Sequence, residues 1–285
     1  MQGMRDIKRR IRSIKNTQQI TKAMKTVSAA KLRKTQNKVI SARPYANKLL
    51  EVLGRLTAGV ETYEHPLFVP RNGNRTAYVV LTGDRGFAGG YNVNVAKLAE
   101  SLIRENPEEQ GVIIACGRKG RDYFRIRGYN IIREYLDIGD DPHYIQAREL
   151  ARELTALYEQ GEVDKIHLVY TKFHSAIRYE PLAQQLLPIL AAPQGETEGE
   201  LEYIYEPEKE SLLHTLVPRY LEVQVYRALL EAKASEHGAR MTAMDNATEN
   251  CAEMIDQLTL SFNRARQAAI TKEISEIVGG AAALS

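Results

Sequence analysis

A seven-residue repeat in the last quarter of the chain most limits the folds that this sequence can adopt. Between Leu216 and Ala269, mostly non-polar residues recur at steps that alternate between four and three. A repeat kept over this many turns is typical of a left-handed coiled coil. The repeat positions are Leu216, Tyr220, Val223, Arg227, Leu230, Ala234, His237, Met241, Met244, Thr248, Cys251, Ile255, Leu258, Phe262, Ala265 and Ala269.

Three clearly polar residues interrupt this repeat: Arg227, His237 and Thr248. His237 shares the stripe of its non-polar neighbours, so its position predicts a residue that packs in the helix contact and sets its register. The six histidines of the chain show no spacing typical of metal ligands.

The other end of the chain also predicts a long helix. Residues 3–57 are rich in helix-forming residues, and Ile7, Ile11 and Ile14 follow a heptad-like spacing. At 1.5 Å per residue this helix is about 80 Å long, and the C-terminal helix is about 115 Å long. Since each is the only element of matching length in the chain, we expect the two to wind together as an antiparallel coiled coil.

The C-terminal helix is the longer of the two, so its end is expected to extend beyond its partner. The last residues, "VGGAAALS" (278–285), carry no charged side chain. An exposed non-polar tip of this kind is typical of a segment that fits into a socket in another protein.

The middle of the chain follows a different period. Short runs rich in β-branched and aromatic residues alternate with helical segments, and this alternation predicts an α/β domain with a largely parallel sheet. The expected strands are residues 76–82, 111–116, 130–136 and 165–173; the expected helices are 93–105, 117–128 and 143–160. Residues 176–189 are expected to add an edge strand or hairpin.

The predicted fold class is therefore α/β plus a long antiparallel coiled coil. The N- and C-terminal helices wind together, and a mostly parallel-sheet, Rossmann-like domain is inserted between them. The predicted parts are an N-terminal coiled-coil helix at 1–58, a linker at 59–75, the α/β globular domain at 76–190, an acidic loop at 191–207 and a C-terminal coiled-coil helix at 208–285.

The charge of the chain is strongly asymmetric. Residues 1–50 hold 14 Lys and Arg against one acidic residue, Asp6, whereas the remaining residues hold 25 against 35. The stretch "ITKAMKTVSAAKLRKTQ" (20–36) contains basic residues and no acidic one. Such a segment is expected to face a negatively charged partner.

The stretch "TGDRGFAGGYN" (82–92) follows a strand and precedes a helix, as a phosphate-binding loop does. It lacks the Gly-Lys-Ser/Thr of a P-loop and the G-x-G-x-x-G of a dinucleotide site. Asp84 would also repel a phosphate. Its glycines, Gly86, Gly89 and Gly90, are expected to serve a tight turn and close packing.

Other signals of chemistry are missing from the sequence. Cys116 and Cys251 lie far apart and are expected to be small buried residues, without a disulfide or a zinc ion. No non-polar run reaches the roughly 20 residues of a membrane span. The basic N-terminus lacks the apolar block of an export signal. We therefore predict no catalytic, cofactor-binding or metal-binding residue.

Several motifs resemble the gamma subunit of bacterial F-type ATP synthases. "NTQQITKAMKTVSAAKL" (16–32) resembles the N-terminal helix of that family, and "TGDRGFAGGYN" resembles the loop after its first strand. "ASEHGARMTAMDNATENC" (234–251) and "LTLSFNRARQAAITKEISEIVGGAAA" (258–283) resemble its C-terminal helix. The resemblance extends over essentially the whole chain. It does not include the cysteine-bearing insertion of chloroplast gamma subunits.

The resemblance implies a central rotor stalk without a catalytic site or cofactor. Its partners would be three alpha and three beta subunits, the epsilon subunit and the membrane ring of c subunits, with no nucleic acid. Rotation of the ring would turn the stalk and couple proton flow to ATP synthesis in the alpha and beta subunits. The expected location is the cytoplasmic face of a bacterial plasma membrane, reached only through the complex.

The resemblance also implies contact residues. Acidic loops of the beta subunits face the rotor in that family, so the rotor–stator contacts carried over are Lys22, Met24, Lys25, Lys31, Arg33, Lys34, Arg266, Gln267 and Thr271. The stretch "YIYEPE" (203–208) resembles the foot on the c ring and epsilon subunit, with Tyr205 and Glu206 as its contacts.

Two other functions fit parts of the sequence. A coiled-coil protein that binds nucleic acid would place the basic helix on phosphates, although no reader motif is present. An enzyme would use the α/β domain on a nucleotide. The order and spacing of the quoted motifs favour the rotor stalk over both.

Overall fold

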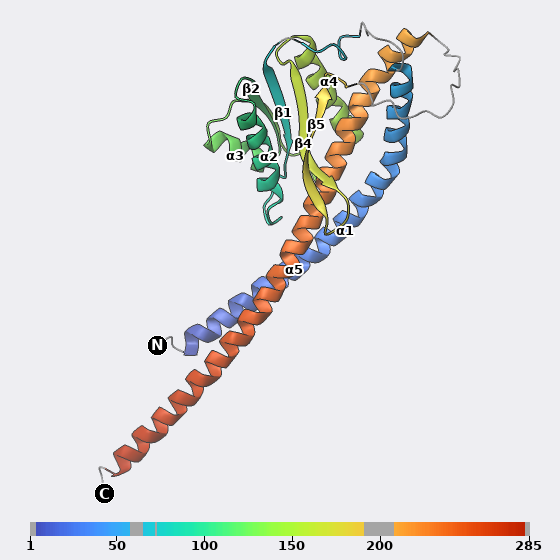
Figure 1. Cartoon of the computed structure of the whole chain (residues 1–285). Coiled ribbons are helices and arrows are strands. Elements are labelled where there is room, and N and C mark those ends of the chain that lie inside the picture. The colour runs from blue at the N-terminus through green and yellow to red at the C-terminus, as the bar shows by residue number, and fades with distance from the viewer. Residues whose placement is uncertain (1–3, 58–64, 72, 191–207, 283–285) are drawn as a thin grey trace. The chain divides into compact units, whose positions relative to one another are not determined.

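A computed structural model describes residues 4–57, 65–71, 73–190 and 208–282. The chain divides into two compact units. The first contains residues up to Ser28 together with those from Met241 onward, and the second contains Ala29–Arg240. Two long helices, α1 (Met4–Thr57) and α5 (Lys209–Ala282), contribute to both units (Figure 1).

A five-stranded sheet forms the centre of the second unit. Its strand order is β3-β2-β1-β4-β5, and every neighbouring pair is parallel except β4 with β5. The strands are β1 (Arg75–Leu81), β2 (Gln110–Cys116), β3 (Ile131–Tyr135), β4 (Lys165–Phe173) and β5 (Tyr179–Leu187). The four parallel strands lie where the sequence predicts them, and β5 is the predicted edge strand.

Non-polar cores cover both faces of the sheet, because successive side chains of a strand point to opposite faces. In β1, Ala77, Val79 and Leu81 belong to one core, and Tyr78 and Val80 belong to the other. A central strand buried on both faces explains why residues 76–81 read as a continuous non-polar run rather than an alternating one.

Different helices complete the two cores. Helices α2 (Tyr91–Glu105) and α3 (Arg118–Ile126) pack on the side of Tyr78, whereas α4 (Tyr144–Glu159) and α5 pack on the opposite side (Figure 1). Leu154 of α4 and Leu221 of α5 are almost completely buried there. Burial of each such side chain contributes about 1.5–3 kcal/mol.

Within the second unit, α5 is buried on nearly all sides. From Leu221 to Arg240 every residue is buried except Tyr226 and Arg227, which are half-buried. A helix that is buried all round is a core element rather than a surface helix. This part of α5 is therefore the central support of the α/β domain.

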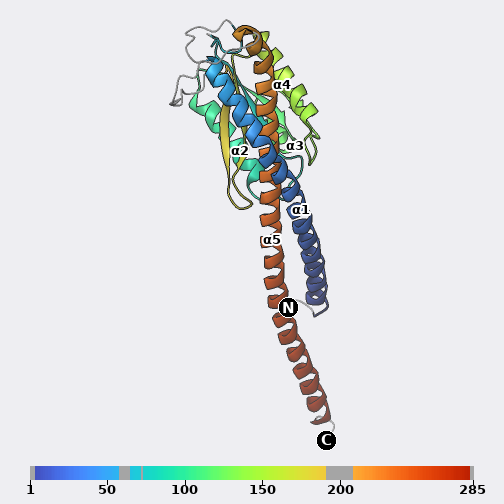
Figure 2. The ribbon, with the colours of Figure 1, turned by 90° about the vertical axis from the view of Figure 1, so that its right-hand side faces the viewer.

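Helices α1 and α5 run antiparallel, as predicted. In the second unit, Ala46 and Leu49 of α1 are buried with Val223 of α5, and Figure 2 shows the two helices side by side. In the first unit, Thr248 Oγ1 donates a hydrogen bond to Thr21 Oγ1 at 2.8 Å. The polar repeat position Thr248 therefore has its partner on the facing helix.

Most repeat positions face inward along α5. His237 is 1% exposed and Ala234 is fully buried. Further along, Ile255, Leu258, Phe262, Ala265 and Ala269 are half-buried while most of their neighbours are exposed. The predicted seam is thus present as far as residue 269. The predicted fold class, an α/β domain with a long antiparallel helix pair, is confirmed.

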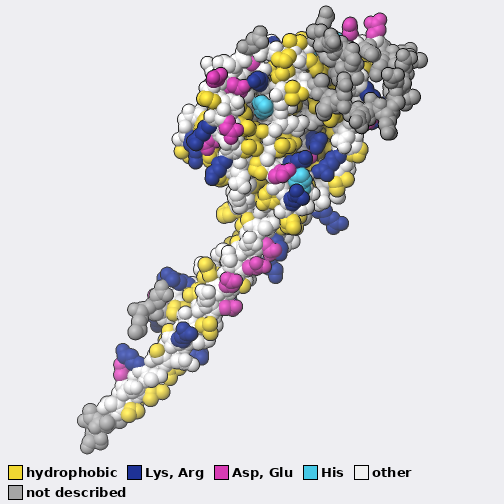
Figure 3. Space-filling model, in the orientation of Figure 1, with side chains coloured by type: hydrophobic (Ala, Val, Ile, Leu, Met, Phe, Trp, Pro, Cys, Tyr) yellow, Lys and Arg dark blue, Asp and Glu magenta, His cyan; other side chains and the backbone are white. Residues whose placement is uncertain are grey.

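The C-terminal part of α5 is exposed, as the longer predicted helix requires. Residues 270–279 are all exposed, and they include Ile270, Ile274 and Ile277. The space-filling view shows non-polar side chains at the surface of this segment (Figure 3). Within the described ranges, no helix has both the length and the non-polar character that a membrane span requires.

Candidate functional site

The predicted contacts on α1 include five basic residues; we add Lys38 to them and call the six the basic face, two of which lie in the first unit and four in the second. Its members are Lys22, Lys25, Lys31, Arg33, Lys34 and Lys38, the last of which the sequence analysis did not single out. Lys22 and Arg33 are exposed and form no salt bridge with any other residue that the structure describes. Their positive charges are therefore not offset by an ion pair within the described part of the chain.

The other four members are paired with acidic residues of the same chain. In the first unit, the Lys25 ammonium donates a hydrogen bond to Asp245 Oδ1 at 2.5 Å, and both side chains are about 40% exposed. The sequence around Lys25 contains no acid, so this counter-charge comes from α5, 220 positions away.

In the second unit, two neighbouring aspartates hold the remaining lysines. Lys31 Nζ lies 2.6 Å from Asp140 Oδ2, and Lys34 Nζ lies 2.8 Å from Asp141 Oδ2. Lys38 donates to the other carboxylate oxygen, Oδ1, of Asp141. Both aspartates lie in the loop between β3 and α4, which we call the aspartate loop (136–143).

These contacts favour the charged forms of both aspartates. Burial alone raises the pKa of Asp140, but the hydrogen bond and the positive charge of Lys31 outweigh it and lower the pKa overall. The pKa of Asp141 is lowered by its hydrogen bonds from Lys34 and then Lys38. Both carboxylates are therefore ionised at neutral pH, as counter-charges must be.

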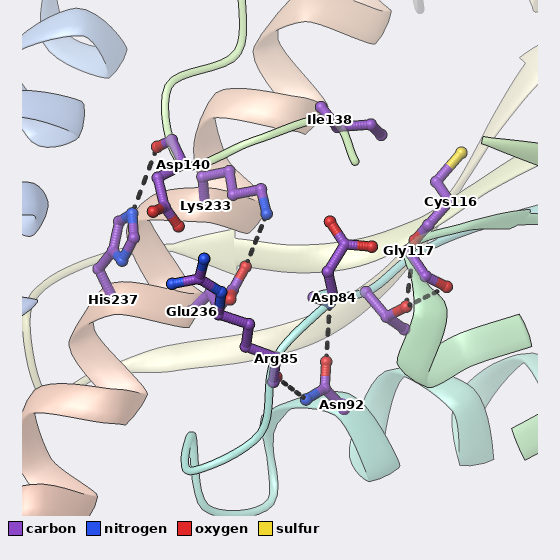
Figure 4. Close-up of polar contacts among 12 residues, drawn as sticks. Asp84, Arg85, Asn92, Cys116, Gly117, Ile138, Asp140, Lys233, Glu236 and His237 are labelled. Atoms are coloured by element: carbon purple, nitrogen blue, oxygen red, sulfur yellow. Dashed lines mark hydrogen bonds and ion pairs between the residues drawn. The ribbon is translucent and has the colours of Figure 1, made fainter. Parts of the chain in front are cut away.

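The aspartate loop is also held by α5. The imidazole Nε2 of His237 lies 3.3 Å from the carbonyl oxygen of Asp140, to which only a protonated Nε2 can donate (Figure 4). Burial lowers the pKa of His237. A neutral ring that carries its proton on Nε2 fits both observations. His237 is buried, and its role in the register of the helix contact stays a prediction.

A buried group of charges lies beside this loop on α5. Glu236 accepts hydrogen bonds from Lys233 at 2.9 Å and from Arg240 at 2.7 Å, and all three are buried (Figure 4 shows Lys233 and Glu236). Arg240 also donates to the carbonyl oxygen of Gly86 at 3.2 Å. These contacts join α5 to the loop that follows β1.

In doubly wound sheets, ligands commonly bind beyond the carboxyl ends of neighbouring strands whose connections run in opposite directions. Here β1 and β4 are such strands, and the side chains of α5 occupy the space beyond β1. A Cβ on Gly83 would lie 2.7 Å from the Glu236 carboxylate. The Asp84 carboxylate is also engaged within the protein, because its Oδ1 accepts a hydrogen bond from the backbone N–H of Arg118 at 3.0 Å.

The glycine-rich loop forms a turn, as the sequence predicts, but its glycines differ in importance. Gly89 has φ +54° and therefore uses the freedom of glycine, whereas Gly90 has an ordinary helical φ of −81°. A Cβ on Gly86 would meet only the end of Lys119 at 3.9 Å. Phe87 has φ +61°, and its ring is 71% exposed.

The expected contacts on α5 are accessible. Arg266, Gln267 and Thr271 are all exposed on the C-terminal segment. Met24 of α1 is half-buried. The remaining expected contacts, Tyr205 and Glu206, lie outside the described residues.

Metal and thiol chemistry find no support in the described part of the chain. It contains no group of three His, Cys, Asp or Glu side chains that fits a metal ion. Cys116 and Cys251 are buried free thiols, as predicted. Burial raises the pKa of the Cys116 thiol.

Comparison with known proteins identifies the family to which this chain belongs. A family model described as ATP synthase matches residues 3–284. The ATP synthase gamma chain of Moorella thermoacetica is 58% identical over 284 residues, which is the full length of both chains. The chain belongs to the ATP synthase gamma-chain family. The gamma chain of Heliobacterium modesticaldum is 54% identical, again over the full length of both.

Solved structures agree with the gamma-chain fold. A chain in the central stalk and c-ring structure of Tetrahymena thermophila mitochondrial ATP synthase is 26% identical, with a TM-score of 0.60. The match covers 80% of this gamma chain and 99% of that chain. A chain of the Euglena gracilis mitochondrial ATP synthase has a TM-score of 0.69 over 99% of this chain, and at 21% identity it supports the fold alone.

Proposed function

We propose that this gamma chain is the central rotor stalk of an F-type ATP synthase. It couples proton-driven rotation of the c ring to ATP synthesis in the alpha and beta subunits, and ATP hydrolysis to rotation in reverse. The observation that carries the proposal is the 58% identity to an ATP synthase gamma chain over the full length of both proteins. The chain transmits motion, and the bond chemistry takes place in the beta subunits.

The proposed partners are three alpha subunits, three beta subunits, the epsilon subunit and the c ring. Similar chains occur in solved structures that contain F1 or the central stalk together with the c ring, which supports this assembly. Since the gamma chains of Moorella thermoacetica and Heliobacterium modesticaldum are bacterial, the proposed location is the cytoplasmic face of the plasma membrane. In this proposal the chain is attached to the membrane through the other subunits of the complex.

Different parts of the chain serve different contacts in this proposal. Residues 1–58 and 208–285 form the shaft, 76–190 form the globular domain, and the 59–75 segment links them. The basic face, together with Met24, Arg266, Gln267 and Thr271, meets the beta subunits. Tyr205 and Glu206, in the segment 191–207, meet the epsilon subunit and c ring.

Mass measurement of the native assembly tests the proposal directly. Purification of the tagged chain from native membranes, released at low ionic strength, is expected to yield a particle with three alpha subunits, three beta subunits and one gamma chain. Native mass spectrometry gives this stoichiometry. Recovery of the chain alone, or bound to nucleic acid, would contradict the rotor assignment.

The basic face offers a test of the rotor–stator contact. Charge pairs between shaft and acidic loops provide orientation and steering more than affinity, and they resist rotation when they must be broken. Replacing Lys25, Lys31 and Lys34 together by glutamine is therefore expected to raise the ATP hydrolysis rate of the assembled complex by about two- to fivefold, the effect of one or two exposed pairs. A steady-state hydrolysis assay measures it, and an unchanged rate rejects the contact.

A further inference from the structure

We propose that Asp140 and Asp141 form an internal counter-charge that competes with the acidic stator loops for the basic face of α1. The aspartate loop thereby sets how strongly the stator holds the shaft. This inference rests on the rotor function proposed above and adds a regulatory element to it.

Asp140 and Asp141 form ion pairs with three lysines of the basic face. Asp140 pairs with Lys31 at 2.6 Å, and Asp141 pairs with Lys34 at 2.8 Å and with Lys38. All three lysines belong to the basic face, which the proposed function assigns to the stator. Each internal carboxylate takes one of the three N–H donors of its lysine and offsets part of the positive charge, so a paired lysine attracts a second, external carboxylate less strongly.

Lys31 and Lys34 remain accessible to solvent while they are paired. The side chains of Lys31 and Lys34 are 39% and 66% exposed, so a second carboxylate can reach each ammonium from solvent. Exposed ion pairs contribute only about 0.2–1 kcal/mol each. Exchange between an internal and an external carboxylate is therefore close to balanced, which is the condition for competition.

Helices α4 and α5 hold the aspartate loop in place. His237 lies 3.3 Å from the Asp140 carbonyl oxygen, and the Gln146 amide donates to the carbonyl oxygen of Ile138 at 3.3 Å. Gly139 takes the positive φ of +83° that turns the chain between them. Because backbone contacts fix this loop, removing the two carboxylate charges leaves its anchoring to α4 and α5 in place.

Two sets of variants in the assembled complex test the competition. Replacing Asp140 and Asp141 by asparagine breaks all three ion pairs and leaves the lysines free for the stator. Replacing Lys31, Lys34 and Lys38 by glutamine breaks the same three pairs and removes three of the six positive charges that are proposed to meet the stator. General loosening of the loop would change the hydrolysis rate in the same direction in both variants, whereas competition changes it in opposite directions.

The expected result is slower ATP hydrolysis in the aspartate variant, by about two- to fivefold at low ionic strength. The lysine variant is expected to hydrolyse ATP faster. Both differences should shrink in high salt, since the Debye length falls to about 3 Å at 1 M. The matched control is Glu105→Gln with Glu149→Gln, which removes two exposed negative charges outside the aspartate loop and should leave the rate unchanged.

The outcomes separate this inference from the function on which it rests. An unchanged or faster rate in the aspartate variant, with a faster rate in the lysine variant, keeps the rotor–stator contact and overturns the competition. Unchanged rates in both variants overturn the contact itself and the competition with it. Native mass spectrometry of each variant must give the same subunit composition, so that altered assembly cannot produce a rate change.

Discussion

Replacing Glu236 by glutamine is expected to lower the free energy of unfolding by about 3–5 kcal/mol, because it leaves buried positive charges without a partner. Glu236 is 2% exposed and pairs with Lys233 at 2.9 Å and Arg240 at 2.7 Å. Glutamine has nearly the same shape, so the loss reflects charge rather than packing. The affected region is the contact between α5 and the carboxyl edge of the sheet.

Chemical denaturation of the full chain measures this loss. The chain contains no tryptophan but 15 tyrosines, so near-ultraviolet circular dichroism reports its tertiary structure. The matched control is Glu253→Gln, which removes an exposed glutamate from the same helix and should change stability by less than about 0.5 kcal/mol. A loss below about 1 kcal/mol for Glu236→Gln would show that water compensates the two cations.

The pH dependence of the free energy of unfolding provides an independent test of the Glu236 ion pairs. Burial raises the pKa of Glu236, but the charges of Lys233 and Arg240 outweigh burial and lower it below the ordinary value of 4.5. A carboxyl group with a lowered folded-state pKa stabilises the protein above its unfolded-state pKa, and this stability is lost as the pH falls through the folded-state value. The stability of Glu236→Gln should therefore depend less on pH below about 4.5.

The periodicities of the sequence predicted the elements of this fold well. Runs such as 76–82 and 165–173 gave the parallel strands, since a strand buried on both faces must be non-polar throughout. The seven-residue repeat gave the helix pair, because helix contacts impose their spacing on the sequence. Both signals are local, so a single sequence was sufficient to find them.

The repeat did not predict that α5 is buried on nearly all sides between Leu221 and Arg240. It marks one stripe of the helix, whereas Glu231, Lys233 and Glu236 lie off that stripe and are buried too. Charged residues three and four positions apart are more typical of a solvated helix face. Their burial depends on the sheet and its loops, which pack around α5 from distant parts of the chain.

The acidic partners of the basic face could not be predicted from the sequence either. Lys31 and Asp140 are separated by 109 positions, and Lys25 and Asp245 by 220. Charge composition shows the excess of positive charge on residues 1–50 but not which of those charges are paired within the chain. Which lysines are neutralised depends on where the β3–α4 loop and α5 lie in the fold, and no local pattern records that.

Replacing Gly117 by alanine is expected to destabilise the α/β domain by about 3–5 kcal/mol, combining backbone strain with a buried clash. Gly117 has φ +101° and ψ +144°, a conformation that is nearly restricted to glycine. A Cβ there would lie 2.3 Å from the backbone carbonyl oxygen of Thr82. Since that oxygen belongs to the backbone, it cannot move aside as a flexible side chain can.

The surroundings of Thr82 explain why the clash cannot relax cheaply. Its N–H donates to the carbonyl oxygen of Cys116 at 2.8 Å, and its Oγ1 accepts the N–H of Gly120 at 2.8 Å. Moving the Thr82 backbone away from residue 117 would therefore disturb the end of β1 and the start of α3 together. Each buried hydrogen bond lost adds about 1–3 kcal/mol.

Gly128→Ala is the matched control for Gly117→Ala. Gly128 also has a positive φ, +74°, but nothing lies within 4 Å of the position of its Cβ. This variant carries backbone strain alone and should lose about 1–2 kcal/mol. Denaturation of both variants then isolates the clash as their difference. Equal losses would mean that the Thr82 backbone relaxes enough to remove the clash. The ends of β1 and β2 would then be flexible where they contact α3.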